Sequence, residues 1–116
     1  WSTPPDHGAA VVATILGDPQ LKQRWADEVE AMRQRIAQLR SGLVEALEPH
    51  GLRERFAHIG VQRGMFSYTG LTPEQVKKLR EQHSVYMVSS GRANVAGIDA
   101  TRLDLLAEAI ADVCRD

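Results

Sequence analysis

The sequence predicts an α+β fold, in which helices, one of them long, pack on a small sheet of about three strands. Apolar residues recur at steps of three and four across residues 19–47, which is the period of one helix face. Two runs rich in β-branched and aromatic residues, 64–70 and 85–88, are typical of strands, and a third short run follows at 93–96. Helix start signals between and after these runs complete the pattern.

Size and composition indicate one ordinary globular domain. The chain has 116 residues, 43% hydrophobic and 25% charged, with a formal net charge of −1. Because basic residues are matched by acidic ones, we expect no nucleic-acid partner, and no apolar run is long enough to suggest a membrane partner. The single cysteine, Cys114, excludes a disulfide framework and favours a reducing compartment, so we expect a cytoplasmic protein.

The first half of the chain reads as a connector followed by two helices. Residues 1–18 comprise a proline-rich lead-in and a short apolar helix, and we assign 19–116 to the domain itself. Asp18 as N-cap and Pro19 at the first helical position predict that the long helix begins there. Its apolar stripe consists of Leu21, Trp25, Val29, Met32, Ile36, Leu39, Leu43 and Leu47.

The second half contains the predicted strands. Residues 56–62 are compatible with a short strand, and 64–70 form a strand bracketed by glycines. Thr72, Pro73 and Gln75 predict a capped helix to about residue 83. We expect the last two strands to form an antiparallel hairpin, with Arg92 at its turn, before a final helix that starts at Asp99 or Thr101.

Arg92 is the residue for which we expect a role in binding a ligand. It lies among small residues, directly after Gly91, between two strand-like runs. A guanidinium is a planar fork of donors that matches a carboxylate or a phosphate, so Arg92 is a candidate anion clamp. The same pattern also fits a solvated residue at a strand edge, and the residues alone leave both interpretations open.

No complete catalytic site can be assembled from these residues. The histidines, His7, His50, His58 and His83, lack the spacing of metal ligands, and we predict no metal site. The lysines, Lys22, Lys77 and Lys78, fall on polar faces of predicted helices, where none is placed to form a Schiff base.

Two glycine-bracketed motifs, residues 64–71 and 90–97, are similar to the C-terminal part of the aspartate and aromatic amino acid aminotransferases. Residues 4–8, 11–16 and 32–36 resemble that family in the same order. Members of the family are fold-type I homodimers that depend on pyridoxal phosphate and are several times longer than this chain. The resemblance therefore implies that the chain is the C-terminal small-domain portion of such an enzyme.

The resemblance also implies roles for three residues. Arg92 matches the arginine that binds the α-carboxylate of the substrate, and Phe66 matches a phenylalanine that moves over the substrate as the small domain closes. Simple core packing remains the alternative for Phe66. Ser2 resembles a position that approaches the active site of the partner subunit.

The family's Schiff-base lysine and its other cofactor-binding residues would precede Trp1, and the sequence does not begin with Met. We therefore expect a fragment that is inactive by itself and binds no pyridoxal phosphate alone. The intact parent would transfer an amino group between an aromatic or dicarboxylic amino acid and a 2-oxo acid, and Tyr68 slightly favours aromatic substrates.

The alternative is a stand-alone, non-catalytic module that binds carboxylates or self-associates. If the chain is a fragment, apolar surface along the first helix and around Trp25 is expected to be exposed and to promote association.

Overall fold

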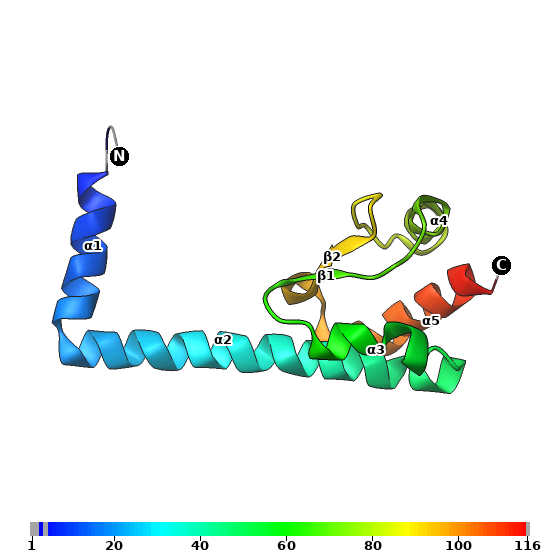
Figure 1. The fold of residues 1–116 in the computed structure, drawn as a ribbon, viewed down its shortest axis with the longest axis horizontal. Coiled ribbons are helices and arrows are strands. Elements are labelled where there is room, and N and C mark those ends of the chain that lie inside the picture. The colour runs from blue at the N-terminus through cyan, green and yellow to red at the C-terminus, as the bar shows by residue number, and fades with distance from the viewer. Residues whose placement is uncertain (1–2, 4, 116) are drawn as a thin grey trace. The chain divides into compact units, whose positions relative to one another are not determined.

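The computed structural model describes residues 3 and 5–115, and it is rich in helix (Figure 1). This confirms an α+β fold with one long helix. The elements in chain order are α1 (Asp6–Gly17), α2 (Pro19–Ala46), the 3-10 helix η1 (Glu48–His50), α3 (Arg53–Val61), β1 (Phe66–Tyr68), α4 (Pro73–His83), β2 (Arg92–Asn94), the 3-10 helices η2 (Val95–Gly97) and η3 (Ala100–Arg102), and α5 (Leu103–Cys114).

The chain divides into two compact units, one up to Gln34 and the other from Arg35 onward. In the first unit, no side chain among the described residues is buried. Its large exposed apolar side chains are those of Val11, Val12, Leu16, Leu21, Trp25, Val29 and Met32. The expected exposed apolar surface along the first helix and around Trp25 is therefore present.

Helix α2 matches the long helix expected from the sequence. The carboxylate Oδ1 of Asp18 accepts hydrogen bonds from the backbone N–H of Gln20 at 2.8 Å and of Leu21 at 3.1 Å, which confirms the predicted N-cap. Only the later part of the apolar stripe is buried, at Leu39, Leu43 and the following Leu47. The spacing of apolar residues along the sequence shows that a helix has an apolar face, but it does not show what covers each part of that face.

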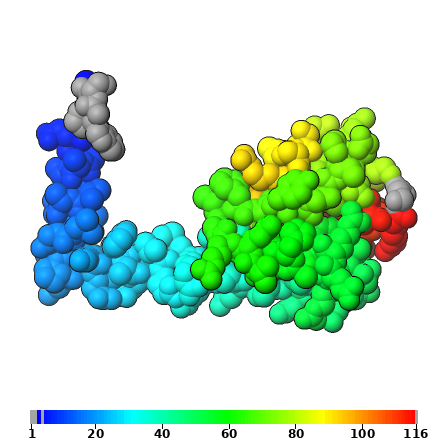
Figure 2. Space-filling view, in the orientation of Figure 1, coloured from blue at the N-terminus to red at the C-terminus, as the bar shows by residue number. Residues whose placement is uncertain are grey.

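The core of the second unit lies between the C-terminal half of α2 and the helices α3, α4 and α5. Figure 2 shows this unit as closely packed atoms. At Gly42 a Cβ atom would come within 2.8 Å of Leu103, so the absence of a side chain allows α2 and the start of α5 to approach. The largest fully buried side chains are Phe56, Leu39, Leu47, Ile59, Leu79, Ile110, Val95 and Val113.

The strand predictions need three corrections. Residues 56–62 belong mostly to α3, in which Phe56 and Ile59 are buried three positions apart, a helical spacing. Residues 85–88 form no strand, although Val85 and Met87 lie against the core. Burial alternates there as predicted, whereas a strand also requires a hydrogen-bonded neighbour.

The expected hairpin between residues 85–88 and 93–96 is the third correction. Instead, β2 pairs antiparallel with β1, in the register Phe66 with Asn94, Ser67 with Ala93, and Tyr68 with Arg92. The described residues thus form a sheet of two strands, not about three. Strand pairing joins segments distant in sequence, so local patterns do not specify it.

The predicted start of the helix at Thr72 is confirmed, whereas the last α-helix begins later than the predicted Asp99 or Thr101. Thr72 and Gln75 form a capping box at the start of α4: Thr72 Oγ1 accepts from the Gln75 N–H at 3.2 Å, and Gln75 Oε1 accepts from the Thr72 N–H at 3.0 Å. Asp99 caps η3 through Thr101, and α5 begins at Leu103. No helix among the described residues combines the length and apolar character needed to cross a bilayer.

The capping box gives a first prediction. Replacing Thr72 with alanine removes the side-chain acceptor and should cost about 1 kcal/mol of local stability. Amide hydrogen exchange in α4 is then expected to accelerate about fivefold, as measured by mass spectrometry. Thr14→Ala is the matched control, because Thr14 Oγ1 donates only within α1, to the carbonyl oxygen of Ala10. Equal exchange in α4 for both variants would contradict the role of the cap.

Candidate functional site

The candidate site lies on the exposed face of the two-stranded sheet. Alternation along each strand places Phe66, Tyr68, Arg92 and Asn94 on one face, and Ser67 with Ala93 on the other. The first four side chains are exposed, whereas Ser67 is buried. The sheet therefore presents an arginine and two aromatic rings on its outer surface.

Arg92 and Phe66, selected from the sequence, are brought together by the strand pairing. The guanidinium carbon of Arg92 lies 4.9 Å from the centre of the Phe66 ring, a cation–π contact. Phe66 is 48% exposed, so it is not a core residue here. Ser2 lies outside the described residues, and its predicted role stays a prediction.

The donors of Arg92 are available to a ligand. Among the described residues, its guanidinium has no hydrogen bond or ion pair with another side chain. Stacking on a ring uses the face of the guanidinium and leaves the N–H groups at its edge free. Arg92 can therefore donate two parallel hydrogen bonds to a carboxylate or a phosphate.

A shallow cavity of about 380 Å³ lies beside this pair. Its lining includes a second arginine, Arg63, which is not among the residues predicted from the sequence to bind a ligand. Since two cationic side chains and no acidic one line the cavity, its charge favours an anion. The lining residues are Gln62, Arg63, Phe66, Ser67, Tyr68, Ser90 and Arg92.

The backbone before Arg92 explains how the side chain is oriented. Gly91 has a φ of +78°, and a Cβ atom there would lie 2.9 Å from the carbonyl oxygen of Leu71. Thr69 donates to the Gly91 carbonyl oxygen from its N–H at 2.9 Å and from Oγ1 at 2.8 Å. This turn requires glycine, both for its conformation and for space.

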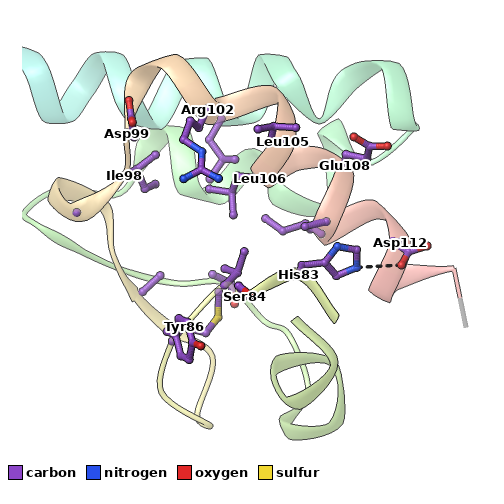
Figure 3. Close-up of a pocket in the computed structure, with 18 of the residues that line it drawn as sticks. His83, Ser84, Tyr86, Ile98, Asp99, Arg102, Leu105, Leu106, Glu108 and Asp112 are labelled. Atoms are coloured by element: carbon purple, nitrogen blue, oxygen red, sulfur yellow. Dashed lines mark hydrogen bonds and ion pairs between the residues drawn. The ribbon is translucent and has the colours of Figure 1, made fainter. Parts of the chain in front are cut away.

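A larger cavity, of about 980 Å³, lies between the segment 83–87 and α5 (Figure 3). At one end His83 Nε2 and Asp112 Oδ2 are 2.9 Å apart, and Arg102 lines another part. Neither Arg92 nor Phe66 lines this cavity. It contains no set of metal ligands, since no group of three or more His, Cys, Asp or Glu side chains suited to a metal occurs among the described residues.

Arg40 is a further residue whose place differs from expectation. Arg40 is not part of the apolar stripe predicted for the long helix, but only 2% of it is exposed. A signal was available: Arg40 lies four residues after Ile36 and three before Leu43, so it shares their face of the helix.

Comparisons with known proteins agree on one family. Residues 1–110 match the family model described as "Aminotransferase class I and II". The chain is 73% identical over all of its 116 residues to the aromatic-amino-acid aminotransferase of Pseudomonas aeruginosa, of which it covers 29%. It is 49% identical to the aspartate aminotransferase of Escherichia coli over 97% of this chain and 28% of that protein.

Solved structures give the same result. An aromatic-amino-acid aminotransferase from Burkholderia pseudomallei, covalently bound to pyridoxal phosphate, matches with a TM-score of 0.90 and 49% identity, over 97% of this chain and 28% of that one. A psychrophilic enzyme from Psychrobacter sp. B6, cocrystallised with aspartic acid, gives a TM-score of 0.92 and 42% identity, over all of this chain and 29% of that one. The chain thus spans less than a third of the length of these relatives.

The turn at Gly91 gives a second prediction. In Gly91→Ala the positive φ alone should cost about 1–3 kcal/mol, and the close approach to Leu71 adds to this cost. A lower midpoint of thermal unfolding, followed by circular dichroism, is expected. Gly97→Ala is the control, since nothing lies within 4 Å of the place that a Cβ atom would take there. Equal midpoints for the two variants would show that the turn tolerates a side chain.

Proposed function

The chain belongs to the class I and II aminotransferase family, and from that premise we propose that it is the C-terminal, small-domain portion of a pyridoxal-phosphate-dependent aminotransferase. The intact enzyme would transfer an amino group between an aromatic or dicarboxylic amino acid and a 2-oxo acid. Within it, residues 1–18 would form a connecting segment with a short helix, and residues 19–116 the small domain. The parent would be a cytoplasmic homodimer, with Ser2 near the partner's site.

The observation that carries this proposal is the unpaired guanidinium of Arg92 in a cavity without acidic residues. Both an amino acid and a 2-oxo acid carry a carboxylate next to the reacting carbon, so one clamp serves both substrates. Arg92 would bind that carboxylate through two hydrogen bonds. Phe66, half exposed against the guanidinium, would cover the bound substrate and reduce the access of water.

The residues of this chain do not fit the attachment of pyridoxal phosphate. A Schiff base needs a lysine in the site, and none of Lys22, Lys77 and Lys78 lines either cavity. We therefore assign cofactor attachment to the remainder of the parent. This chain would contribute binding and orientation of the substrate.

An aromatic substrate is the better-supported choice. The aromatic-amino-acid enzyme of P. aeruginosa shares 73% identity with this chain, whereas the aspartate aminotransferase of the same species shares 43%. Tyr68, 60% exposed, lines the shallow cavity together with Phe66 and Arg92. An aromatic side chain of the substrate could stack against these rings.

A second candidate function is a stand-alone, non-catalytic module that binds carboxylates or self-associates. The observation that favours it is the row of exposed apolar side chains on α1 and the first half of α2. Apolar surface of this kind is typical of an interface, either with the rest of the same protein or with another copy.

The proposed clamp predicts the effect of Arg92→Lys in the full-length protein that contains these residues. Lysine keeps the positive charge but loses the fork, so the KM values for the amino acid and for the 2-oxo acid should both rise about tenfold or more. Steady-state kinetics with each substrate varied in turn measures this. Arg53→Lys is the control, because Arg53 is exposed and its ion pair among the described residues is with Glu48, at 2.6 Å. Unchanged KM values in Arg92→Lys would refute the clamp.

The fragment proposal predicts that the isolated chain of 116 residues is catalytically inactive. With added pyridoxal phosphate, an aromatic amino acid and a 2-oxo acid, it should show no turnover beyond that of the free cofactor. The full-length protein under the same conditions is the positive control. Turnover by the isolated chain above the free-cofactor rate would mean that the catalytic groups lie within these residues.

A further inference from the structure

The side chain of Arg40 is buried inside the second unit, on the face of α2 that packs against the core. Only 2% of the residue is exposed, and it lies between Leu39 and Leu43, which are also buried. Burial lowers the pKa of Arg40, because the charged form is separated from water. Among the described residues, no carboxylate is hydrogen-bonded to it or paired with it.

The acceptors of Arg40 come instead from the backbone around the candidate site. Nη1 donates to the carbonyl oxygen of Ile59 at 3.0 Å and to Ser67 Oγ. Nη2 donates to the carbonyl oxygens of Gly64 at 2.6 Å and Phe66 at 2.9 Å. One guanidinium therefore connects α2 to the end of α3, to the turn before β1, and to β1 itself.

The Phe66 carbonyl lies on the edge of β1 that no strand of the described residues covers. Toward β2, the Met65 carbonyl oxygen accepts from the Val95 N–H at 2.8 Å, and the Thr69 N–H donates to Gly91. Alternate residues of an antiparallel strand bond to opposite sides, so the carbonyl of Phe66 points away from β2. Arg40 occupies the place of a third strand there, and His58 Nε2 donates to the Tyr68 carbonyl oxygen, at 2.9 Å, on the same edge.

Burying the charge of Arg40 without a counter-ion costs free energy, even though the side chain supports a strand. Apolar side chains of similar volume often stabilise a protein as well or better. The guanidinium instead constrains geometry, since its planar donors fix the positions of several acceptor oxygens at once. The acceptors it fixes include the backbone of Phe66 and the hydroxyl of Ser67, and both residues line the shallow cavity.

We propose that Arg40 is a positioning residue for the carboxylate clamp: it holds β1 in the register and tilt that place the Phe66 ring against Arg92. This inference rests on the proposed function. Arg40 does not touch the substrate. It acts through the backbone of β1, whose ladder to β2 carries Arg92.

The test measures substrate binding separately from turnover in the full-length protein. Arg40→Met keeps the length and volume of the side chain without its donors, and Arg40→Lys keeps the charge without the fork. The readouts are KM and kcat with L-phenylalanine and 2-oxoglutarate, and the Kd of 3-phenylpropionate, which has a carboxylate and a ring but no amino group. A misplaced clamp should raise KM and Kd about tenfold in Arg40→Met and less in Arg40→Lys, with kcat at saturation changed less than about threefold.

The matched control is Arg33→Met, on the same helix. Arg33 is exposed, and among the described residues it bonds to Glu30 alone, through two contacts of 2.6 Å that lower the pKa of Glu30 to about 2. Its replacement should leave KM, kcat and Kd unchanged. If Arg40→Met does not fold, Arg40→Lys and Ser67→Ala, which removes one acceptor, provide the same comparison through their KM and Kd values.

The outcomes separate this inference from the proposed function. If Arg92→Lys weakens 3-phenylpropionate binding and the folded Arg40 variants bind it as the wild type does, with only a lower midpoint of unfolding, Arg40 is merely structural and the inference fails. If Arg92→Lys also leaves the Kd unchanged, the carboxylate clamp itself is wrong and the inference falls with it. Weaker binding in both sets of variants, with Arg33→Met unaffected, supports both.

Discussion

The candidate site depends on a two-stranded ladder that could not persist by itself. Each strand has three residues, and an isolated pair of this kind is at best marginally stable in water. Two arginines of α2 support it: Arg40 bonds to β1, and Arg35 donates to the carbonyl oxygens of Ala96 at 3.1 Å and Ile98 at 3.3 Å, just after β2. The sheet is therefore anchored to a helix that is buried in the core at Leu39 and Leu43.

Arg40 and Arg92 lie in opposite environments and have different roles. Arg40 is buried and has most of its donors committed to backbone and hydroxyl oxygens, so it orders the protein and cannot bind a ligand. Arg92 is exposed, its guanidinium lies over the Phe66 ring, and among the described residues it has no hydrogen bond or ion pair with a side chain. Preorganised donors that remain unsatisfied are what an anion-binding site requires, because little reorganisation is needed when the ligand arrives.

The helices of the first unit carry apolar side chains that are not buried in the described part of the chain. No side chain of the described residues before Arg35 is buried, although the helices there carry valine, leucine and tryptophan. The chain spans 28–29% of the relatives it matches, and an apolar helix face is stable in water only when something covers it. Segment 85–88 likewise has the alternation of a strand, but it pairs with no strand among the described residues.

Local chemistry in the sequence by itself determined the helices α1, α2, α4 and α5 and the caps at the starts of α2 and α4. Asp18 and the pair Thr72 and Gln75 act within three residues of their own positions, and so they could be predicted. The motif resemblance selected Arg92 and Phe66. Only the tertiary structure decided that β1 pairs with β2, that residues 56–61 are helical, and that Arg40 bonds to the backbone of β1. Each of these depends on contacts between segments far apart in the chain, and local propensity carries no information about such contacts.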